Sequence, residues 1–348
     1  MLKLYLIGTV CSFLGALILT PVSIRLAHRF GAVDTLDPRK IHTSIKPRWG
    51  GIGILSGFFL GLSVLWFFFP DFGHLLKFKQ AIIHKKEVLF TLRLSEQFAG
   101  ILAGTLLLFI LGLIDDRRPV KAGMKFLLQI IAAYIAMIYG VRIYGLSITG
   151  VEFYAHFPLW LMQIVTVLWL VGMSNAVNLI DGLDGLAGGI VAIVAGSFLA
   201  VTLVQVQGHS ALFDHQMSLA GLIAASLLGG VLGFLVFNTY PARVFMGDSG
   251  SLSMGFLIGC IAVIGTFKTT IMAVLFVPFL LVAFPVTDMT LAFGRRLLKK
   301  QNPFAPDRSH LHHRLLDAGW SQREVVLLVY VVTLVLALVS LTMVGMKR

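Results

Sequence analysis

Charged side chains are scarce in this sequence. Asp, Glu, Lys and Arg make up only 13% of the 348 residues, whereas 57% are hydrophobic and the mean hydropathy is +0.90. So few charges cannot cover the surface of a water-soluble protein of this size. Cysteine is also rare, and Cys11 and Cys260 both lie in apolar runs, so neither a disulfide framework nor a thiolate metal site is indicated. The composition therefore predicts a polytopic membrane protein.

Acidic residues are outnumbered by basic ones. The chain has 16 Asp and Glu against 28 Lys and Arg, which gives a formal net charge of +12. In a membrane protein this excess indicates basic loops that set the orientation, and secondly contacts with anionic lipids or phosphorylated substrates. Nucleic acid is a poorer explanation and is not expected as a partner.

Apolar segments of about the length that a bilayer requires occur ten times along the chain. They lie near residues 4–27, 51–69, 97–114, 122–141, 158–177, 186–207, 217–237, 252–267, 271–293 and 324–345. An even number of spans places both termini on the same side of the membrane. We therefore expect a single all-α integral-membrane domain over residues 1–348.

The basic residues gather on one side of this predicted topology. Most of the 28 Lys and Arg fall within the set of connections near 25–48, 115–125, 175–186, 238–250 and 294–323. The positive-inside rule predicts that these connections face the cytoplasm and that both termini lie outside. The external loop 70–96 is an exception, because it holds five basic residues. We interpret it as an amphipathic segment on the membrane surface.

The unusual polar side chains all fall on the predicted inner side. They are Asp115, Asp116, Asn175, Asn178, Asp181, Asp184, Asn238, Asp248, His310, His312 and His313. A carboxylate at membrane depth costs about 2.5–3.5 kcal/mol on insertion scales. We therefore expect the acids to face one polar cavity at the cytoplasmic side. Ordinary solvated helix ends among the lipid headgroups are the alternative for any single residue.

The segment NAVNLIDGLDGLA, residues 175–187, directly follows an apolar run. If the helix continues, Asp181 and Asp184 lie on one face, with Asn178 one turn earlier. The interspersed glycines weaken a helix and allow a ligand or another backbone to come close. The pattern favours a functional site, and a capped helix end is the alternative.

Adjacent Asp115 and Asp116 cannot share one helical face. At most one of the two carboxylates can contact a given atom, while the other positions the first or binds a cation. Lys125 begins the next span, where a lysine contacts either the lipid headgroups or, with acids nearby, a phosphate.

The segment NTYPARVFMGDSGS, residues 238–251, is more specific. Glycines flank Asp248 and Ser249 in a turn whose amides can open toward an anion, and Ser251 is a candidate cap for the next helix. Phe245 either lies at the bilayer boundary or offers a flat face to a base.

Two basic connections complete the set. In NPFAPDRSHLHHRL, residues 302–315, no Cys or third suitably spaced His joins His312 and His313 in a zinc site. Contacts with phosphate or sugar suit these residues better, and anionic lipid is the alternative. Arg48 lies in DPRKIHTSIKPRWGG, residues 37–51, where membrane anchoring and substrate binding explain the charge equally well.

Five stretches match one known family in order and framing. They read PRKIHTSIKPRWGGIGI, GLIDDRRPVKAGMKFLLQ, NAVNLIDGLDGLAGG, NTYPARVFMGDSGS and PFAPDRSHLHHRLLDAGWSQRE, and they cover all five predicted inner connections. The chain resembles the polyprenyl-phosphate N-acetylhexosamine-1-phosphate transferase superfamily, glycosyltransferase family 4. It is most similar to the bacterial branch that starts O-antigen, enterobacterial common antigen or teichoic acid linkage synthesis.

The resemblance implies an enzyme of the bacterial cytoplasmic membrane. Its donor would be a UDP-N-acetylhexosamine, its acceptor undecaprenyl phosphate, its cofactor Mg²⁺ with Mn²⁺ as a substitute, and its second product UMP. By the same resemblance, Asp248 matches the magnesium ligand and Asn178 the amide beside it. Asp115 and Asp116 match a pair near the lipid phosphate.

The remaining matches concern the donor. The resemblance places Lys125, Arg308 and His312 near the diphosphate and Phe245 near the uracil. Further candidates from the same segments are Asp181 and Asp184 for catalysis, and Arg48, Asn175, Asn238, His310 and His313 for substrate binding.

The choice of sugar depends on one departure from a related branch. Transferases of phospho-MurNAc-pentapeptide have three successive histidines after a leucine, whereas this chain continues Leu311, His312, His313 with Arg314. The difference favours UDP-N-acetylglucosamine as donor, and the pentapeptide branch is the alternative.

Two mechanisms are considered for the inferred reaction. In the first, Asp115 or Asp116 takes the last proton from the lipid phosphate, whose second pKa is about 6. In the second, Asp248 is a nucleophile, which is less favoured because a metal-bound carboxylate attacks poorly. A transporter for phosphorylated lipids or anions is the alternative from another class. Against it, no inverted repeat is evident and the acids gather on one side. A homodimer is left open.

Overall fold

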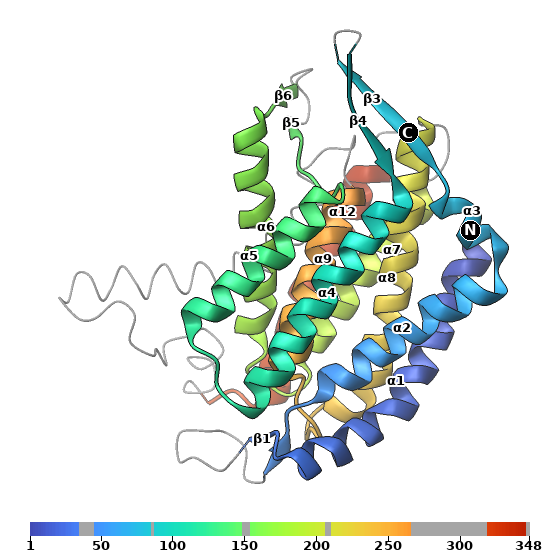
Figure 1. Cartoon of the computed structure of the whole chain (residues 1–348). Coiled ribbons are helices and arrows are strands. Elements are labelled where there is room, and N and C mark those ends of the chain that lie inside the picture. The colour runs from blue at the N-terminus through green and yellow to red at the C-terminus, as the bar shows by residue number, and fades with distance from the viewer. Residues whose placement is uncertain (35–44, 85–86, 148–153, 206–209, 266–318, 346–348) are drawn as a thin grey trace.

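The protein is a bundle of long helices (Figure 1). The computed structural model describes residues 1–34, 45–84, 87–147, 154–205, 210–265 and 319–345. The long helices are α1 (Leu2–Phe30), α2 (Gly50–Phe68), α4 (Leu94–Arg117), α5 (Ala122–Ile138), α6 (Leu159–Ile180), α7 (Leu186–Gln205), α8 (Ala211–Asn238), α9 (Gly247–Gly265) and α12 (Gln322–Gly345).

These helices agree closely with the predicted spans. Within the described residues, eight helices are long and apolar enough to cross a membrane, and α5 is a shorter apolar helix. The predicted span 271–293 lies outside the described residues. The expectation of an all-α polytopic membrane protein is confirmed in this form, because long apolar helices satisfy every backbone group within the bilayer.

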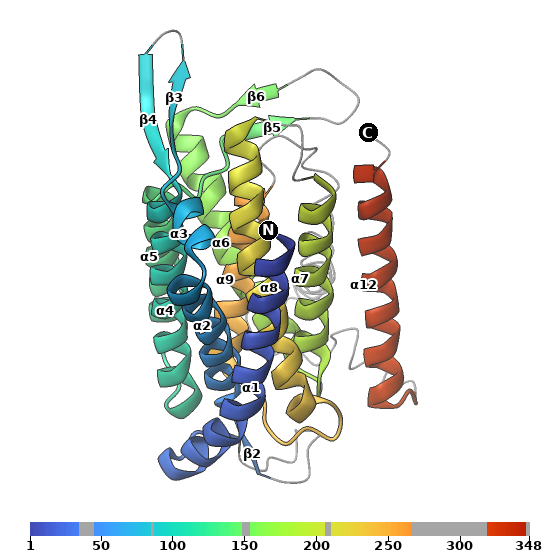
Figure 2. The ribbon, with the colours of Figure 1, turned by 90° about the vertical axis from the view of Figure 1, so that its right-hand side faces the viewer.

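In the part of the chain that the structure describes, strands are confined to three short antiparallel pairs. They are β1 (Val33–Asp34) with β2 (Lys46–Pro47), β3 (Lys79–His84) with β4 (Glu87–Arg93), and β5 (Gly145–Ser147) with β6 (Tyr154–His156). Loop 70–96, which we interpreted as an amphipathic segment on the membrane surface, has secondary structure that we did not predict. It forms the short helix α3 (Pro70–Leu76), the β3–β4 hairpin and the first turn of α4, and the hairpin projects beyond the helix ends (Figures 1 and 2).

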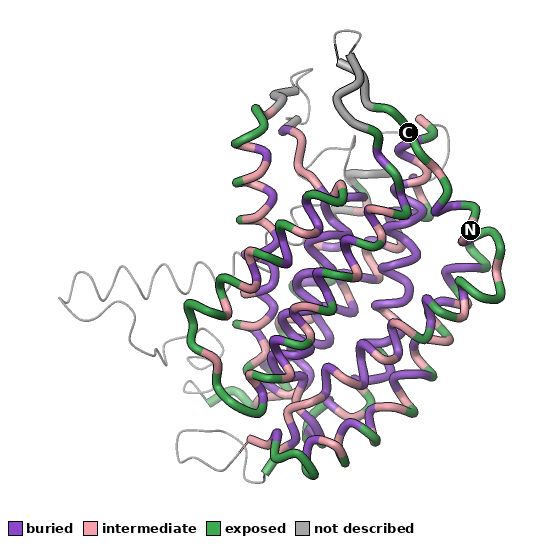
Figure 3. The backbone as a smooth tube through the Cα atoms, in the orientation of Figure 1, coloured by how far each residue is buried: buried purple, intermediate pink, exposed green. Residues whose placement is uncertain are grey.

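Helix α9 lies at the centre of the bundle, and all of its residues are buried (Figure 3). It packs against α2, α4, α6 and α8. A Cβ atom at Gly112 of α4 would overlap with the backbone of Ser249, and one at Gly51 of α2 would overlap with that of Gly250. Glycine at these positions lets neighbouring helices approach α9 to backbone contact, as is common between helices in membranes.

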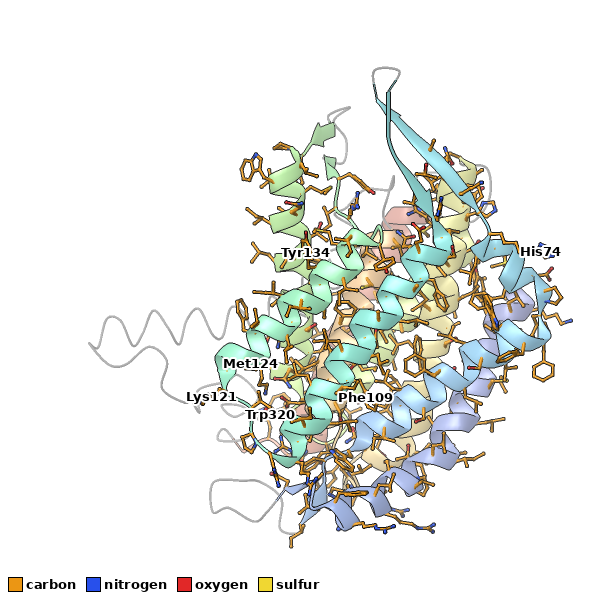
Figure 4. The ribbon with its side chains drawn as sticks, in the orientation of Figure 1. His74, Phe109, Lys121, Met124, Tyr134 and Trp320 are labelled. Carbon is orange, nitrogen blue, oxygen red and sulfur yellow. The ribbon has the colours of Figure 1, made fainter. Side chains whose placement is uncertain are left out.

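Large apolar side chains cover the outer surface of the bundle. On α5, Met124 and Tyr134 are each 50% exposed (Figure 4), and on α1 Ile18 is 66% exposed. Such a surface is stable against lipid chains and not against water.

The two ends of the bundle differ. Helix α1 begins and α12 ends toward one end, whereas α4 and α6 end and α9 begins at the other, beside β1 (Figures 1 and 2). The acids and amides singled out in the sequence lie at this second end.

Candidate active site

Helices α4, α6 and α9 include residues that we predicted to lie in the connections between spans. Asp115 lies in the last turn of α4, Asn178 in the last turn of α6 and Asp248 in the first turn of α9. These side chains are therefore held on helix ends and not in flexible connections. Three segments far apart in the chain bring them together.

Lys125 of α5 joins two of the acids. Its Nζ donates to Asp115 Oδ2 at 3.0 Å and to Asp248 Oδ2. Asn178 Nδ2 donates to Asp248 Oδ1 at 3.0 Å and to Ser251 Oγ at 2.8 Å, so this amide orients the Asp248 carboxylate. These bonds join Asp248, Asn178, Asp115 and Lys125, which the sequence analysis proposed for the metal, the lipid phosphate and the diphosphate, in one cluster.

Asp116 has a different environment from its neighbour. Its carboxylate accepts from Asp248 N at 2.8 Å, from Ser249 N at 3.1 Å and from Ser249 Oγ at 2.8 Å. Arg48 Nε lies 3.8 Å from Asp116 Oδ1. The anion at the start of α9 is thus Asp116 itself, a favourable place for negative charge at the positive end of a helix.

These contacts confirm one expectation and correct another. Asp115 and Asp116 point to different partners, as the helical geometry predicts. The amides of Asp248 and Ser249, which we expected to face a ligand anion, are occupied by Asp116. Ser251 does not cap α9, because its hydroxyl donates to Gly247 O four residues earlier.

Asp181 and Asp184 do not share a helical face. Helix α6 ends at Ile180, and residues 181–185 form a turn whose last residue, Gly185, has a φ of +79°. A left-handed residue at this point stops the helix and rotates the following chain. The condition under which we expected the two acids to share one face, a helix that continues past Ile180, is therefore not met.

Asp181 belongs to the acidic cluster. Burial, followed by the negative charges of Asp116 and Asp248, raises the pKa of its carboxyl to about 7, against the opposing effects of Arg48 and the Gly247 amide. A carboxyl with a pKa this high is a candidate proton carrier near neutral pH.

Asp184 and Asn238 hold loops together. Asp184 Oδ2 accepts from Ala242 N at 2.9 Å. Asn238 is buried, and its side chain accepts from Gly185 N at 3.1 Å and donates to Val244 O at 2.8 Å. Because both ends of the Asn238 amide are used inside the protein, this residue braces the two loops, and its substrate contact stays a prediction.

Asn175 lies deeper along α6, away from the acids. Its Nδ2 donates to Gln129 Oε1 of α5 and to Val171 O, and Gln129 Nε2 donates back to Asn175 Oδ1 at 3.4 Å. This pair ties α5 to α6 within the apolar bundle, where paired amides stabilise helix contacts. Gln129 was missed in the sequence, although its position one turn after Lys125 was a usable signal.

The first connection contributes positive charge. Arg48 Nη1 lies 4.0 Å from Asp34 Oδ1, and the same guanidinium contacts Asp116. Lys46 Nζ donates to Ala242 O at 2.6 Å, which fastens this connection to the loop before α9. Phe245 is half-buried, and its backbone is hydrogen-bonded to Pro47 and Gly50. The other predicted site residues, Arg308, His310, His312 and His313, lie outside the described residues.

The chemistry of the cluster suits a hard divalent cation. Carboxylates of Asp115 and Asp248 converge on one cationic group, the Lys125 ammonium. No group of three or more His, Cys, Asp or Glu side chains within the described ranges has a metal-binding arrangement. Mg²⁺ needs only one or two protein carboxylates, because water and substrate phosphates complete its shell. The residues present fit that requirement.

Fold and site together define a polytopic membrane protein with an acidic, lysine-bridged site at one end of its helix bundle. A family model described as glycosyl transferase family 4 matches residues 98–266. The chain belongs to this family and to the polyprenyl-phosphate N-acetylhexosamine-1-phosphate transferase superfamily.

Three curated relatives illustrate the family. A probable undecaprenyl-phosphate N-acetylglucosaminyl 1-phosphate transferase of Bacillus subtilis is 33% identical over 97% of this chain and 84% of its own length. A decaprenyl-phosphate N-acetylglucosaminephosphotransferase of Mycolicibacterium smegmatis is 33% identical over 88% of this chain and 73% of its own. A phospho-N-acetylmuramoyl-pentapeptide-transferase of Halalkalibacterium halodurans is 31% identical over 97% of both chains.

Proposed function

We propose that this protein transfers GlcNAc-1-phosphate from UDP-GlcNAc to undecaprenyl phosphate, releasing UMP. The products would be undecaprenyl-diphospho-GlcNAc, the first lipid-linked intermediate of a cell-envelope polysaccharide, and UMP. The site would face the cytoplasm of a bacterial inner membrane, with both termini outside. The observation that best supports the proposal is the contact of Asp115, Lys125, Asp248 and Asn178 at one bundle end, in a chain with a GlcNAc-1-phosphate transferase relative over 97% of its length.

Charge balance explains why such a site needs cations. The reaction brings two phosphate anions together, beside the carboxylates of Asp115, Asp116, Asp181 and Asp248. Lys125 and Arg48 are the cations that contact these acids within the described residues. They leave the cluster negative, so an added divalent cation would have to enter with the anionic donor.

Mg²⁺ is therefore proposed as the cofactor, with Asp248 as the carboxylate that would hold it. Asn178 would keep Asp248 in place through its hydrogen bond. When bound, the metal would neutralise the diphosphate and make the β-phosphorus more electrophilic.

The residues of the chain would perform the other tasks. An oxygen of the lipid phosphate attacks the β-phosphorus of the donor, and the bond from that phosphorus to the bridging oxygen breaks as UMP leaves. Lys125 would move from the carboxylates to the phosphates. Asp115, whose side chain is 11% exposed, would accept the last proton of the lipid phosphate. Asp116, with 0% exposure and three bonds from α9, would position Asp248.

A direct assay tests the proposal. Purified protein in detergent is mixed with UDP-GlcNAc, undecaprenyl phosphate and Mg²⁺, and UMP is measured. We expect UMP only when both substrates are present, and at least 100-fold less from Asp248→Asn. Release of UMP from donor alone, with a labelled protein adduct, would favour the covalent mechanism. If no UMP is released and the protein transports undecaprenyl phosphate, the result would contradict the proposed transferase and support the transporter alternative.

The pentapeptide donor is the second candidate. It is supported by the Halalkalibacterium halodurans relative, which aligns over 97% of both chains. Parallel assays with UDP-GlcNAc and UDP-MurNAc-pentapeptide separate the two, and we expect turnover with UDP-GlcNAc because Arg314 stands where the pentapeptide branch has its third histidine.

A further inference from the structure

Helix α12 contacts the loop that positions Asp181. The hydroxyl of Tyr330, in the third turn of α12, donates to Gly185 O at 2.6 Å. The Tyr330 ring packs on Gly189 of α7 so closely that a Cβ at Gly189 would overlap with it. Tyr330 thus reaches the turn between α6 and α7 from a helix far along the chain.

The peptide groups of Gly185 are held from both sides. Its N–H donates to Asn238 at the end of α8, and its C=O accepts from Tyr330. The φ of +79° is one that glycine adopts without strain, so the turn has little stiffness of its own. The hydrogen bonds to Asn238 and from Tyr330 therefore add to two local bonds, from Leu186 N to Leu183 O and from Gly189 N to Gly185 O, in fixing the path of residues 181–185.

A second contact joins α12 to the other loop of the site. The guanidinium of Arg323, in the first turn of α12, lies 5.1 Å from the ring centroid of Tyr240, in the loop that leads to Asp248. Ser321 and Glu324 fix where α12 begins, because each side chain bonds the backbone N–H of the other. The first turn of α12 therefore contacts the loop that precedes α9, and its third turn contacts the turn that follows α6.

We infer that Tyr330 is a positioning residue, which places Asp181 through its hydrogen bond to Gly185. This inference rests on the proposed function and adds to it a role for α12. Asp181 N donates to Asn178 O at 3.4 Å, and the Asn178 side chain bonds Asp248, so a shift of the turn would move one carboxyl of the cluster relative to another. Among the described residues, the hydroxyl of Tyr330 hydrogen-bonds to Gly185 and not to an acid, so Tyr330 acts through the loop.

Tyr330→Phe tests the inference, because it keeps the ring on Gly189 and removes only the donor. We expect kcat to fall about 3- to 10-fold, with KM for UDP-GlcNAc and for the lipid changed less than about twofold. Amide hydrogen exchange should rise in the peptide covering residues 181–189. Thr333→Val is the matched control, because it removes a hydroxyl of the same helix that donates only to Val329 O within α12.

Gly189→Ala gives an independent perturbation of the same bond, because the added methyl displaces the Tyr330 ring. Its effect on kcat should not multiply with that of Tyr330→Phe, since both changes break one hydrogen bond. Unchanged kcat and unchanged exchange in Tyr330→Phe would overturn the inference, as would equal losses in Thr333→Val. If the wild type releases no UMP, the proposed function fails, while the exchange experiment still decides whether Tyr330 orders the turn.

Discussion

Replacing either Asp115 or Asp116 with asparagine should distinguish the roles of these two neighbouring aspartates. In Asp116→Asn only one oxygen is left to accept the bonds from Asp248 N, Ser249 N and Ser249 Oγ. Whichever way the amide turns, its NH₂ group faces a backbone N–H of α9. One buried donor then lacks an acceptor, which costs about 1–3 kcal/mol. Loss of the anion at the helix start adds about 0.3–1 kcal/mol.

Asp115→Asn should have a much smaller effect on stability. Its remaining oxygen still accepts from Val120 N, which lies 2.8 Å from Asp115 Oδ1. The lost ion pair with Lys125 is partly exposed, and Lys125 keeps Asp248. The activity loss should instead be large, and larger at pH 6 than at pH 8, because more of the lipid phosphate then needs a base.

Thermal unfolding of the two variants in one detergent, together with UMP release at both pH values, measures the difference. We expect a clear drop of the unfolding midpoint for Asp116→Asn and nearly none for Asp115→Asn. Equal midpoints for wild type and Asp116→Asn would refute the assignment of Asp116 to the start of α9. Full activity of Asp115→Asn at pH 6 would refute its role as base.

Three further outcomes are expected. The pKa of about 7 for Asp181, against a usual value of 3.8, means that the folded state binds this proton more tightly, so the stability of the metal-free protein should fall as pH rises from about 4 to about 7. Melting curves across this range should show the fall, and Asp181→Asn should flatten it. Gly112→Ala should separate α4 from α9 at Ser249 and reduce UMP release at least tenfold, whereas Gly123→Ala, with open space around it, should leave the rate unchanged. EDTA should stop UMP release, and Mg²⁺ should raise the melting temperature of the wild type but not of Asp248→Asn.

Hydropathy alone predicted most of the architecture. Each expected span in the described part of the chain has its helix, because roughly twenty apolar residues in a bilayer have few other stable conformations. The meeting of Asp115, Asn178 and Asp248 also follows from topology, since all three were predicted at the ends of spans on one side. Positive charge and span parity were enough to place them there.

The β3–β4 hairpin was missed for a different reason. Its two runs, KQAIIH and EVLFTLR, are rich in β-branched and aromatic residues and flank Lys85 and Lys86. This is a usable hairpin signal. The basic residues drew the interpretation toward a membrane surface instead, because charge was considered before strand propensity.

Individual roles within the site could not be predicted, because they depend on how the helices are rotated against one another. Asp115 and Asp116 differ by one position on α4, and only the close approach of α9 at Gly112 decides which of them meets the α9 amides. In the same way, Asp184 differs from Asp181 because α6 stops at Ile180. Neither difference can be predicted from the composition or from the spacing of the residues.

Hydrogen-bond saturation gives a physical criterion for dividing the polar residues of such a site. A buried group in the bilayer needs partners whatever its function, so an acid or amide at a helix end is not evidence of chemistry by itself. Asn238 and Asp116 have all their oxygens engaged by the backbone or by Ser249, and a substrate would have to displace those bonds. Asp115 and Asp248 are bridged by a lysine side chain that can move away without unfolding a helix. Chemistry at this site is therefore expected from the acids whose partner is mobile, and structure from those whose partner is the backbone.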